Sequence, residues 1–249
     1  MHFVKVEIDA GVATVALDRG KVNALNDTMI SELRRCLEAL AEDRDLKAVV
    51  LTGRGKFFSF GFDVTEFLSF TKAQFTDYLI RFTDLYTYLF TYPKPVIGAV
   101  NGHAIAGGCM LLLPCDFRLM VPGKAKISLN EITFGASVFA GCTEMLRFLT
   151  GSAAATEILY SGAMYSAEEA LDLELIQSIV DEDLLIDRAK GVAEDMAAKP
   201  AAAFAGIKAL LRKPVAEEMK RREAVSIHDF VEIWYTEETW ANLQKIKIY

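Results

Sequence analysis

The stretch from Ile97 to Phe117, IGAVNGHAIAGGCMLLLPCDF, constrains the fold of this chain more than any other. An apolar run leads into Asn101-Gly102-His103, and Gly107-Gly108 then stands directly before a second apolar segment. The pattern predicts a buried strand, a loop and a helix start. Glycines there let a ligand approach the backbone, and the first N–H groups of a helix lack intrahelical partners. The stretch therefore indicates either a tight turn in a packed core or a site that favours developing negative charge.

Composition excludes several classes of protein. With 52% hydrophobic and 24% charged residues, the chain resembles an ordinary soluble domain with one large core, or one core and a small appendage. A net charge of -7 without a long basic block argues against nucleic acid or an anionic membrane as partner. The apolar stretch from Val96 to Leu113 is interrupted by Asn101, His103 and glycines, so we expect a buried element and no membrane span. The N-terminus alternates like a hairpin and lacks a leader pattern, which predicts a cytoplasmic protein.

The cysteines and histidines show no metal-binding pattern. No C-x-x-C spacing occurs, and the histidines are far apart in sequence. We therefore expect reduced core thiols and no metal. The residues are Cys36, Cys109, Cys115 and Cys142, with His2, His103 and His228.

The order of predicted elements is typical of an α/β fold with a helical appendage. A hairpin precedes a helix capped by Asn26, and Ser166 with Glu169 forms a capping box. The softest boundary lies near Pro200, which divides the chain into a core, 1–199, and a C-terminal helical region, 200–249. Strands are predicted over 47–52, 116–121 and 175–180, and helices over 71–91, 143–149, 152–160, 184–198 and 201–211, followed by a long final helix.

Four motifs occur in an order typical of one known family. They are Asp18…Asn23-Ala24-Leu25, Phe57 to Asp63, Ala99-Val100-Asn101-Gly102…Ala106-Gly107-Gly108-Cys109…Cys115-Asp116, and Ser128-Leu129-Asn130-Glu131. Through them the chain resembles the crotonase (enoyl-CoA hydratase/isomerase) superfamily over essentially its whole length. It looks most like the mitochondrial-type Δ3,Δ2-enoyl-CoA isomerases, through Ala106-Gly107-Gly108-Cys109, Ser128-Leu129-Asn130-Glu131 and the tail Arg222-Glu223-Ala224…Asp229-Phe230.

The resemblance implies a spiral of β-β-α units with a C-terminal helical region that forms homotrimers, or hexamers as dimers of trimers. It implies acyl-CoA thioester substrates in fatty-acid metabolism, with coenzyme A as part of the substrate and no redox or metal cofactor. The family holds the thioester oxygen with two backbone N–H groups, which correspond here to those of Phe60 and Gly107. The family usually has a small residue where Phe60 stands, so we expect a reshaped pocket beside it.

The number of acidic residues at the expected site limits which reaction of the family we expect. Enoyl-CoA hydratases carry two glutamates around a water, and the corresponding positions here are Met110 and Glu131. Moving a double bond from C3 to C2 needs one base that takes a proton from C2 and returns it at C4, which a lone Glu131 suits. Met110 would help to exclude water. Glu144 is the reserve base, near where some peroxisomal-type isomerases place their acid, or else a helix first-turn acid. Glu131 itself has the alternatives of a surface carboxylate in a turn and of a salt-bridge partner.

Binding residues are also implied by the resemblance. The acyl pocket is expected to involve Met110, Phe134, Phe139, Phe230 and Trp234, the last two from this chain or from a neighbouring subunit. Asp116 and Asp63 are interpreted as closing loops beside the site, and His103 as a satisfied loop histidine. The tail from Lys245 to Tyr249 is not a peroxisomal Ser-Lys-Leu address. Coenzyme A is expected to contact Lys21, Val22, Ala24, Phe58, Phe60, Phe62 and Asp63, with Lys21, Arg54 and Lys56 near its phosphates.

The sequence thus predicts a Δ3,Δ2-enoyl-CoA isomerase that uses Glu131 as base. Alternatives are another crotonase reaction, such as hydration, decarboxylation or thioester hydrolysis, and a non-catalytic acyl-CoA-binding subunit.

Overall fold

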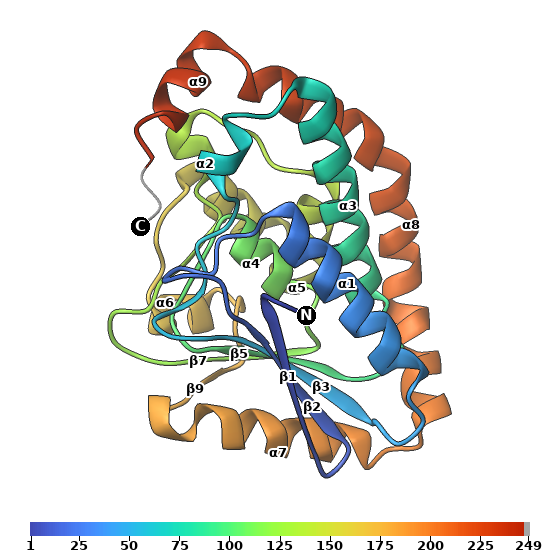
Figure 1. Cartoon of the computed structure of the whole chain (residues 1–249). Helices are drawn as coiled ribbons and strands as arrows, with labels where there is room; N and C mark the ends of the chain where they lie inside the picture. The colour runs from blue at the N-terminus through green and yellow to red at the C-terminus, as the bar shows by residue number, and fades with distance from the viewer. Residues whose placement is uncertain (247–249) are drawn as a thin grey trace.

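A computed structural model describes residues 1–246; Lys247 to Tyr249, the end of the tail examined for an address signal, lie outside the described residues. Its larger sheet has the order β1-β2-β3-β5-β7-β9 (Figure 1). The predicted hairpin is confirmed, because β1 and β2 pair antiparallel, and the later pairs are all parallel. The strands are β1 (Val4–Asp9), β2 (Val12–Leu17), β3 (Ala48–Gly53), β5 (Val96–Val100), β7 (Phe117–Met120) and β9 (Ser178–Ile179).

A smaller parallel sheet, β4-β6-β8, stands beside the larger one. It consists of β4 (Phe57–Ser59), β6 (His103–Ile105) and β8 (Ile127–Ser128). Along the chain each of its strands follows one strand of the larger sheet, so β3-β4, β5-β6 and β7-β8 repeat the same step. This repetition is the predicted β-β-α spiral, and it stacks the ends of β4, β6 and β8 next to one another.

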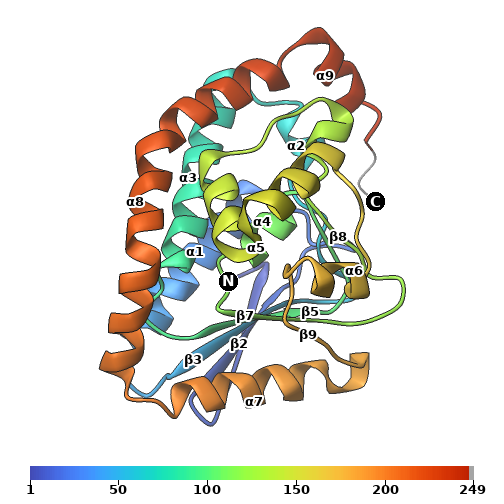
Figure 2. The ribbon, with the colours of Figure 1, turned by 180° about the vertical axis from the view of Figure 1, so that it is seen from behind.

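Helices cover both faces of the larger sheet. Helix α7 packs on β2, β3, β5 and β7, while α1, α3, α4, α5 and α8 lie on the other side (Figures 1 and 2). The helices are α1 (Asp27–Glu42), α2 (Val64–Phe67), α3 (Lys72–Phe90), α4 (Gly107–Leu112), α5 (Ala140–Ser161), α6 (Ala167–Asp172), α7 (Leu185–Ala197), α8 (Ala201–Trp234) and α9 (Glu237–Leu243), with short 3₁₀ turns η1 (Glu131–Phe134) and η2 (Glu182–Leu184). Within residues 1–246, no helix combines the length and the apolar character needed to cross a membrane.

Local capping explains where several helices begin. The Asn26 side chain accepts a hydrogen bond from the N–H of Met29 at 3.0 Å, and Ser166 forms its reciprocal box with Glu169, so both predicted caps are confirmed. The four cysteines are buried free thiols, as predicted.

Some predicted elements have different bounds. The break between the helices expected over 143–149 and 152–160 is confirmed, because Gly151 has the non-helical angles φ 75° and ψ 170° inside α5; the outer bounds of α5 are slightly wider than expected. The strand expected over 175–180 is confined to Ser178–Ile179, and α9 was not predicted. The helix expected to end at Leu211 continues through Pro214. The carbonyl that Pro214 leaves without a helical donor belongs to Leu210, which is 80% exposed, so water can hydrate it.

Helix α8 is anchored in the core. Its Lys208 and Arg212 side chains are buried against Asp116, at 2.6 Å and 3.1 Å, and its last turns bury Phe230 and Trp234. The region beyond Pro200 therefore shares the core of the preceding residues and reaches the far end of the molecule, beside the ends of the smaller sheet.

Candidate active site

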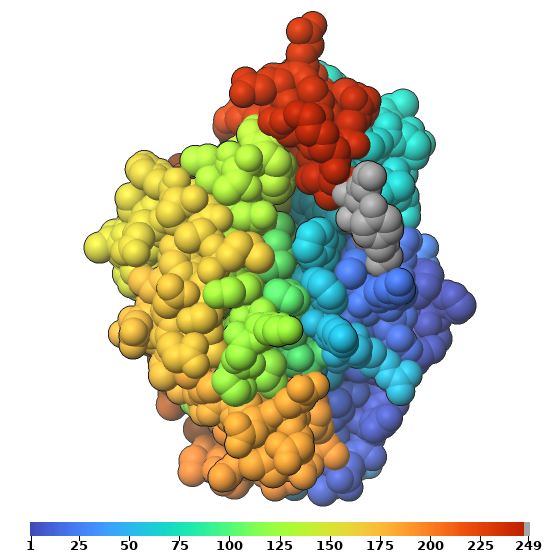
Figure 3. All heavy atoms as spheres, turned by 90° about the vertical axis from the view of Figure 1, so that its left-hand side faces the viewer, coloured from blue at the N-terminus to red at the C-terminus, as the bar shows by residue number. Residues whose placement is uncertain are grey.

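A pocket of about 280 Å³ lies where the ends of the smaller sheet meet the C-terminal helices. Its walls are mostly apolar, and they come from four separate stretches of sequence. These cyan, green and red stretches meet on one face of the molecule (Figure 3). The lining residues are Phe60, Phe62, Val64, Ile105, Ala106, Met110, Asn130, Glu131, Thr133, Phe134, Phe230, Trp234 and Ile246.

Glu131 brings a carboxyl group into this apolar pocket. It opens the 3₁₀ turn directly after β8, and its backbone carbonyl accepts a hydrogen bond from the N–H of Ala136. The residue is 4% exposed, and its Oε2 has no hydrogen-bond partner within residues 1–246. Burial away from water raises the pKa of Glu131 to about 8, because the charged form loses hydration and no cation compensates. The carboxyl group can therefore exchange a proton near neutral pH.

The turn into α4 presents a backbone N–H next to Ala106, which lines the pocket. Gly107 is the first residue of α4, and such an N–H has no partner inside the helix. The preceding residue, Ala106, has φ 51° and ψ -121°, a conformation that costs an L-residue on the order of 1–3 kcal/mol. Strain of this kind is concentrated at functional sites in proteins, which agrees with a role for this turn.

The second backbone N–H expected as a donor is already hydrogen-bonded within the protein. The N–H of Phe60 donates to the carbonyl of Val22 at 2.9 Å, so it is not free to bind a ligand oxygen. The N–H of Phe62 makes no hydrogen bond to any described residue. The expected role of the Phe60 N–H is therefore contradicted, and the N–H left unbonded in this segment is that of Phe62, two residues further along. Leu25 donates to the carbonyl of Gly61 at 2.7 Å and accepts from the N–H of Asp63 at 3.0 Å, so it pairs with the residues on either side of Phe62 and leaves the N–H of Phe62 unbonded.

Close packing holds the two donors together. A Cβ on Gly107 would stand 2.9 Å from the Phe62 ring, and a Cβ on Gly108 would stand 2.4 Å from the carbonyl oxygen of Ser59. Only glycine allows α4 to begin so close to the segment that carries Phe62.

Buried polar side chains fix the loops around these donors. Asn23, with φ 50°, donates from its side chain to the carbonyls of Arg54 and Phe57 at 3.0 and 2.9 Å. Asn101 accepts from the N–H of Gly53 at 3.0 Å, and Ser59 Oγ donates to the carbonyl of Asn23 at 2.7 Å. Motif residues that lie outside the pocket thus hold in place the backbone segments that form it.

Four of the five residues expected in the acyl pocket line it, and one does not. Met110, Phe134, Phe230 and Trp234 line the pocket, and Phe230 and Trp234 do so from the same chain. Phe139 does not line the pocket. Its ring is fully buried behind the lining residues Phe230 and Phe62, with ring centroids 4.5 Å and 6.4 Å away, respectively.

The other titratable groups expected near the site are ion-paired or lie outside the pocket. Glu144 pairs with Arg222 of α8 and with Arg147 at 3.7 Å, and it does not line the pocket. Asp63 caps α2 and binds Arg19 at 2.6 Å, which agrees with loop closure and leaves its carboxylate occupied. His103 lies outside the pocket, its ring 4.9 Å from that of Phe57.

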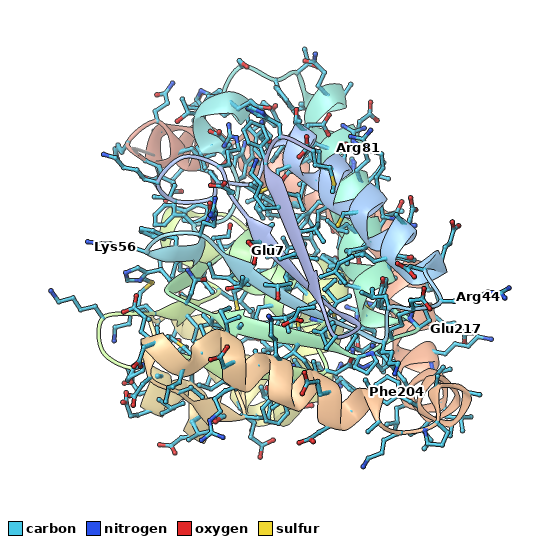
Figure 4. All side chains as sticks on the ribbon, turned by 60° about the horizontal axis from the view of Figure 1, so that its bottom comes forward. Glu7, Arg44, Lys56, Arg81, Phe204 and Glu217 are labelled. Atoms are coloured by element: carbon cyan, nitrogen blue, oxygen red, sulfur yellow. The ribbon has the colours of Figure 1, made fainter. Side chains whose placement is uncertain are left out.

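A second, open depression adjoins the first and contains the predicted basic residues. Lys21 and Lys56 are exposed at its rim, where Lys56 extends away from the body of the molecule (Figure 4), and Arg54 pairs with Asp18 at 3.1 Å. Phe57 of this depression and Phe60 of the pocket have ring centroids 5.9 Å apart. Of the expected coenzyme A contacts, Val22 lines it, whereas the side chains of Ala24 and Phe58 are buried in the core and cannot contact a ligand there.

Sequence reasoning missed several lining residues. Asn130 was part of a recognised motif, and Ala106 immediately precedes a predicted donor, so position alone could have identified both. Nothing in the sequence pattern singled out Thr133 or Ile246. Within residues 1–246, no group of three or more His, Cys, Asp or Glu side chains is arranged to hold a metal ion.

Comparison with known proteins gives consistent results. The family model described as enoyl-CoA hydratase/isomerase matches residues 7–244. A Bacillus subtilis protein named "Probable enoyl-CoA hydratase" is 33% identical over 85% of this chain and 82% of its own length. The Mus musculus "Enoyl-CoA delta isomerase 1, mitochondrial" is 30% identical over 91% of this chain and 79% of its own.

A solved structure of an isomerase is also similar to this chain over nearly its whole length. The crystal structure of human mitochondrial delta3-delta2-enoyl-CoA isomerase superposes with a TM-score of 0.92 at 29% identity, covering 97% of this chain and 95% of that one. The chain therefore belongs to the enoyl-CoA hydratase/isomerase family, the crotonase superfamily of acyl-CoA enzymes.

Proposed function

We propose that this protein is a Δ3,Δ2-enoyl-CoA isomerase. One observation carries the proposal: Glu131 is the single carboxylate among the described residues that line the pocket, and Met110, which also lines it, corresponds by the family resemblance to the first of the two hydratase glutamates. Similarity to the mouse and human isomerases supports it. One base suffices for a proton shift, whereas hydration uses an acid–base pair around a water.

The backbone donors stabilise the charge that develops. The thioester oxygen accepts hydrogen bonds from the N–H groups of Phe62 and Gly107, which are present before the reaction begins. When the C2–H bond breaks, the electron pair delocalises into the thioester and gives a dienolate with negative charge on this oxygen. A donor of this kind contributes about 2.7–4 kcal/mol to transition-state stabilisation.

Glu131 moves the proton. Its carboxylate takes the proton from C2 and returns it to C4, which leaves a C2=C3 double bond conjugated with the thioester and a substrate of unchanged mass. A pKa of about 8 suits both steps, because the group is strong enough as a base and still acidic enough to return the proton. The apolar side chain of Met110 opposes entry of the water that hydration would need.

The open depression accommodates the coenzyme. Lys21, Lys56 and Arg54 offer positive charge for phosphates, and the contact between Phe57 and Phe60 joins this depression to the pocket. The acyl chain then extends past Phe62 and Glu131 toward the end of α8.

Incubation with a medium-length trans-3-enoyl-CoA tests the proposal. We expect conjugation absorbance to appear at unchanged mass, and the Glu131→Gln variant to lose it while still binding coenzyme A esters. A trans-2-enoyl-CoA, offered separately, should gain no water. The absence of any isomerisation would contradict the proposal.

The second candidate function is hydration of a 2-enoyl-CoA. The name of the Bacillus subtilis relative, at 33% identity, favours it. A product heavier by one water would establish it. Loss of carbon dioxide or release of free coenzyme A would indicate decarboxylation or thioester hydrolysis, and binding without turnover of any ester would indicate a non-catalytic subunit.

A further inference from the structure

The segment 135–141 connects the 3₁₀ turn that begins with Glu131 to helix α5. Its backbone has few hydrogen bonds of its own. The N–H of Ala136 donates to the carbonyl of Glu131 at 3.0 Å, but the N–H groups of residues 137–139 make no hydrogen bond to any described residue. The position of Glu131 therefore depends on what holds this segment at its two ends.

Helix α8 holds the end of the segment that leads into α5. Phe139, the residue before α5, gives the helix no side-chain cap, and two side chains of α8 accept from its first N–H groups instead. Ser226 Oγ accepts from the N–H of Ala140 at 3.0 Å, and Glu223 Oε2 accepts from the N–H of Gly141 at 2.6 Å. A carboxylate suits this place because the N-terminus of a helix carries partial positive charge.

The Glu223 carboxylate is itself fixed by a third helix. Helix α8 packs on both α3 and α5 (Figure 2), and the hydroxyl of Tyr86, a fully buried side chain of α3, donates to Glu223 Oε1. A Cβ on residue 141 would stand 2.5 Å from this hydroxyl, so the close approach requires Gly141. Three helices thus meet at one carboxylate, which the proposed proton transfer does not use.

Helix α9 holds the end of the segment nearer to Glu131. Thr239 Oγ1 donates to the carbonyl of Gly135 at 2.8 Å. Between the two ends, the fully buried ring of Phe139 packs on Phe230 of α8, with centroids 4.5 Å apart. The C-terminal helices therefore hold the segment at both ends and in its middle.

Glu131 and Glu223 also lie near the same side chain. Burial raises the pKa of the Cys142 thiol, and negative charge on either carboxyl group raises it further. The start of α5 is thus within electrostatic range of Glu131 as well as connected to it along the chain.

We propose that Glu223 is a positioning residue for Glu131: by capping α5 it fixes the segment 135–141, and with it the direction in which the Glu131 carboxyl group points. Without the Glu223 carboxylate, the N–H of Gly141 and the hydroxyl of Tyr86 lose their acceptor, and the segment can shift. A displacement of about 1 Å at a reacting group can lower a rate about a hundredfold. The inference rests on the proposed function for the role of Glu131 as the base.

Kinetics of two Glu223 variants test the inference. In Glu223→Ala we expect kcat for a 3-enoyl-CoA to fall about ten- to a hundredfold, with KM nearly unchanged because the depression proposed for the coenzyme lies elsewhere. Glu223→Gln should restore most of kcat, since its amide can accept from Gly141 and donate to the Tyr86 hydroxyl. Normal kcat in Glu223→Ala, or an equal loss in both variants, would overturn the proposal.

Two tyrosines provide a matched pair if Glu223→Ala fails to fold. Tyr86→Phe removes the hydroxyl that fixes Glu223, whereas Tyr92→Phe removes a buried hydroxyl that donates to the carbonyl of Leu37 at 2.8 Å, outside this segment. Urea unfolding should show similar losses of stability in both. We expect kcat per folded molecule to fall about three- to tenfold in Tyr86→Phe alone. Equal kcat in the two variants would overturn the proposal.

Titration of Glu131 gives a measurement that needs no substrate. Carboxyl-carbon NMR follows its protonation, with the signal assigned by its absence from Glu131→Gln. In Glu223→Ala the loosened segment admits water, so the pKa of Glu131 should fall from about 8 toward 4.5. Glu223→Gln removes the same charge and keeps the hydrogen bonds, so it should leave this pKa near that of the parent. The neighbouring thiols of Cys109 and Cys142 stay neutral, because burial raises the pKa of each.

The same titration separates this inference from the proposed function. A fall in the pKa of Glu131 in Glu223→Ala, in a protein that isomerises no ester, would support the positioning role and reject the isomerase. Isomerisation by the parent, with an unshifted Glu131 in Glu223→Ala, would support the isomerase and overturn the positioning role.

Discussion

Glu131 is a buried carboxylate and Asp116 a nearly buried one, with its side chain 10% exposed, and the surroundings of the two groups are opposite. Asp116 accepts hydrogen bonds from the N–H of Val96 at 2.8 Å and from Lys208 at 2.6 Å, and it pairs with Arg212 at 3.1 Å. Glu131 has an oxygen without any partner and a pKa raised to about 8 by burial.

The difference separates structure from chemistry. Burying an ionised group raises the free energy of the folded state unless the group is paired. A paired carboxylate can therefore connect structural elements. An unpaired buried carboxylate destabilises the fold, which is typical of residues at functional sites. The same distinction separates the N–H of Phe60, which is bonded to Val22, from that of Phe62, which has no acceptor among the described residues. Five predictions break or sharpen this comparison.

Replacing Glu131 by Gln should have the largest effect on activity. We expect a loss in kcat of about 10²- to 10⁴-fold, because the amide cannot accept a proton from C2. Steady-state assay with a 3-enoyl-CoA measures it, and Glu144→Gln is the matched control, since Glu144 is paired with Arg222. Loss of activity confined to the control would transfer the base to Glu144.

Replacing Asp116 by Ala should act on stability and leave the chemistry intact. The change strands Lys208 and Arg212 as buried cations without their carboxylate, which costs about 3–5 kcal/mol. Urea unfolding measures the loss, and kcat per folded molecule should stay unchanged. A variant as stable as the parent would show that Asp116 is not the anchor of α8.

Backbone ester substitution should distinguish the two candidate donors. Replacing the residue 62 amide by an ester removes its N–H and should lower kcat by about 10²- to 10³-fold. The same change at residue 60 removes a bond to Val22, so we expect about 1 kcal/mol of lost stability and near-normal kcat. The opposite pattern would restore Phe60 as the oxyanion donor.

The pH dependence should follow the raised pKa of Glu131. Activity needs the ionised carboxylate, so kcat/KM should rise by about tenfold from pH 7 to pH 9 and level off above the pKa of about 8. A profile that is flat between these values would show that Glu131 is ionised at neutral pH.

The free energy of unfolding should decrease as pH rises, whereas activity increases. The folded pKa lies above the ordinary value of 4.5, so the unfolded chain releases this proton first as pH rises. The stability that Glu131 contributes is complete below pH 4.5 and is lost as pH rises through about 8. The Glu131→Gln variant lacks this loss, which comparison of unfolding curves at several pH values would show.

Much of this protein could be predicted from its sequence because the signals are local. The hairpin from alternating Val4, Val6 and Ile8, the cap at Asn26 and the glycines at 107 and 108 depend on near neighbours in the chain. The order of the motifs then identified the family. Of the two positions that are glutamates in hydratases, only Glu131 is acidic here and the other is Met110, which predicted a pocket with one acid. The pocket in the structure has one carboxylate among its described lining residues. The oligomeric state stays a prediction from resemblance.

What the tertiary structure decided depends on contacts between distant residues. The N–H of Phe60 is occupied because Val22, nearly forty residues earlier, lies against it, and Phe139 is excluded from the pocket because Phe62 and Phe230 cover it. Sequence determines which polar groups the chain carries. Only the fold determines which of them find a partner, and the groups left without one in this pocket define its chemistry.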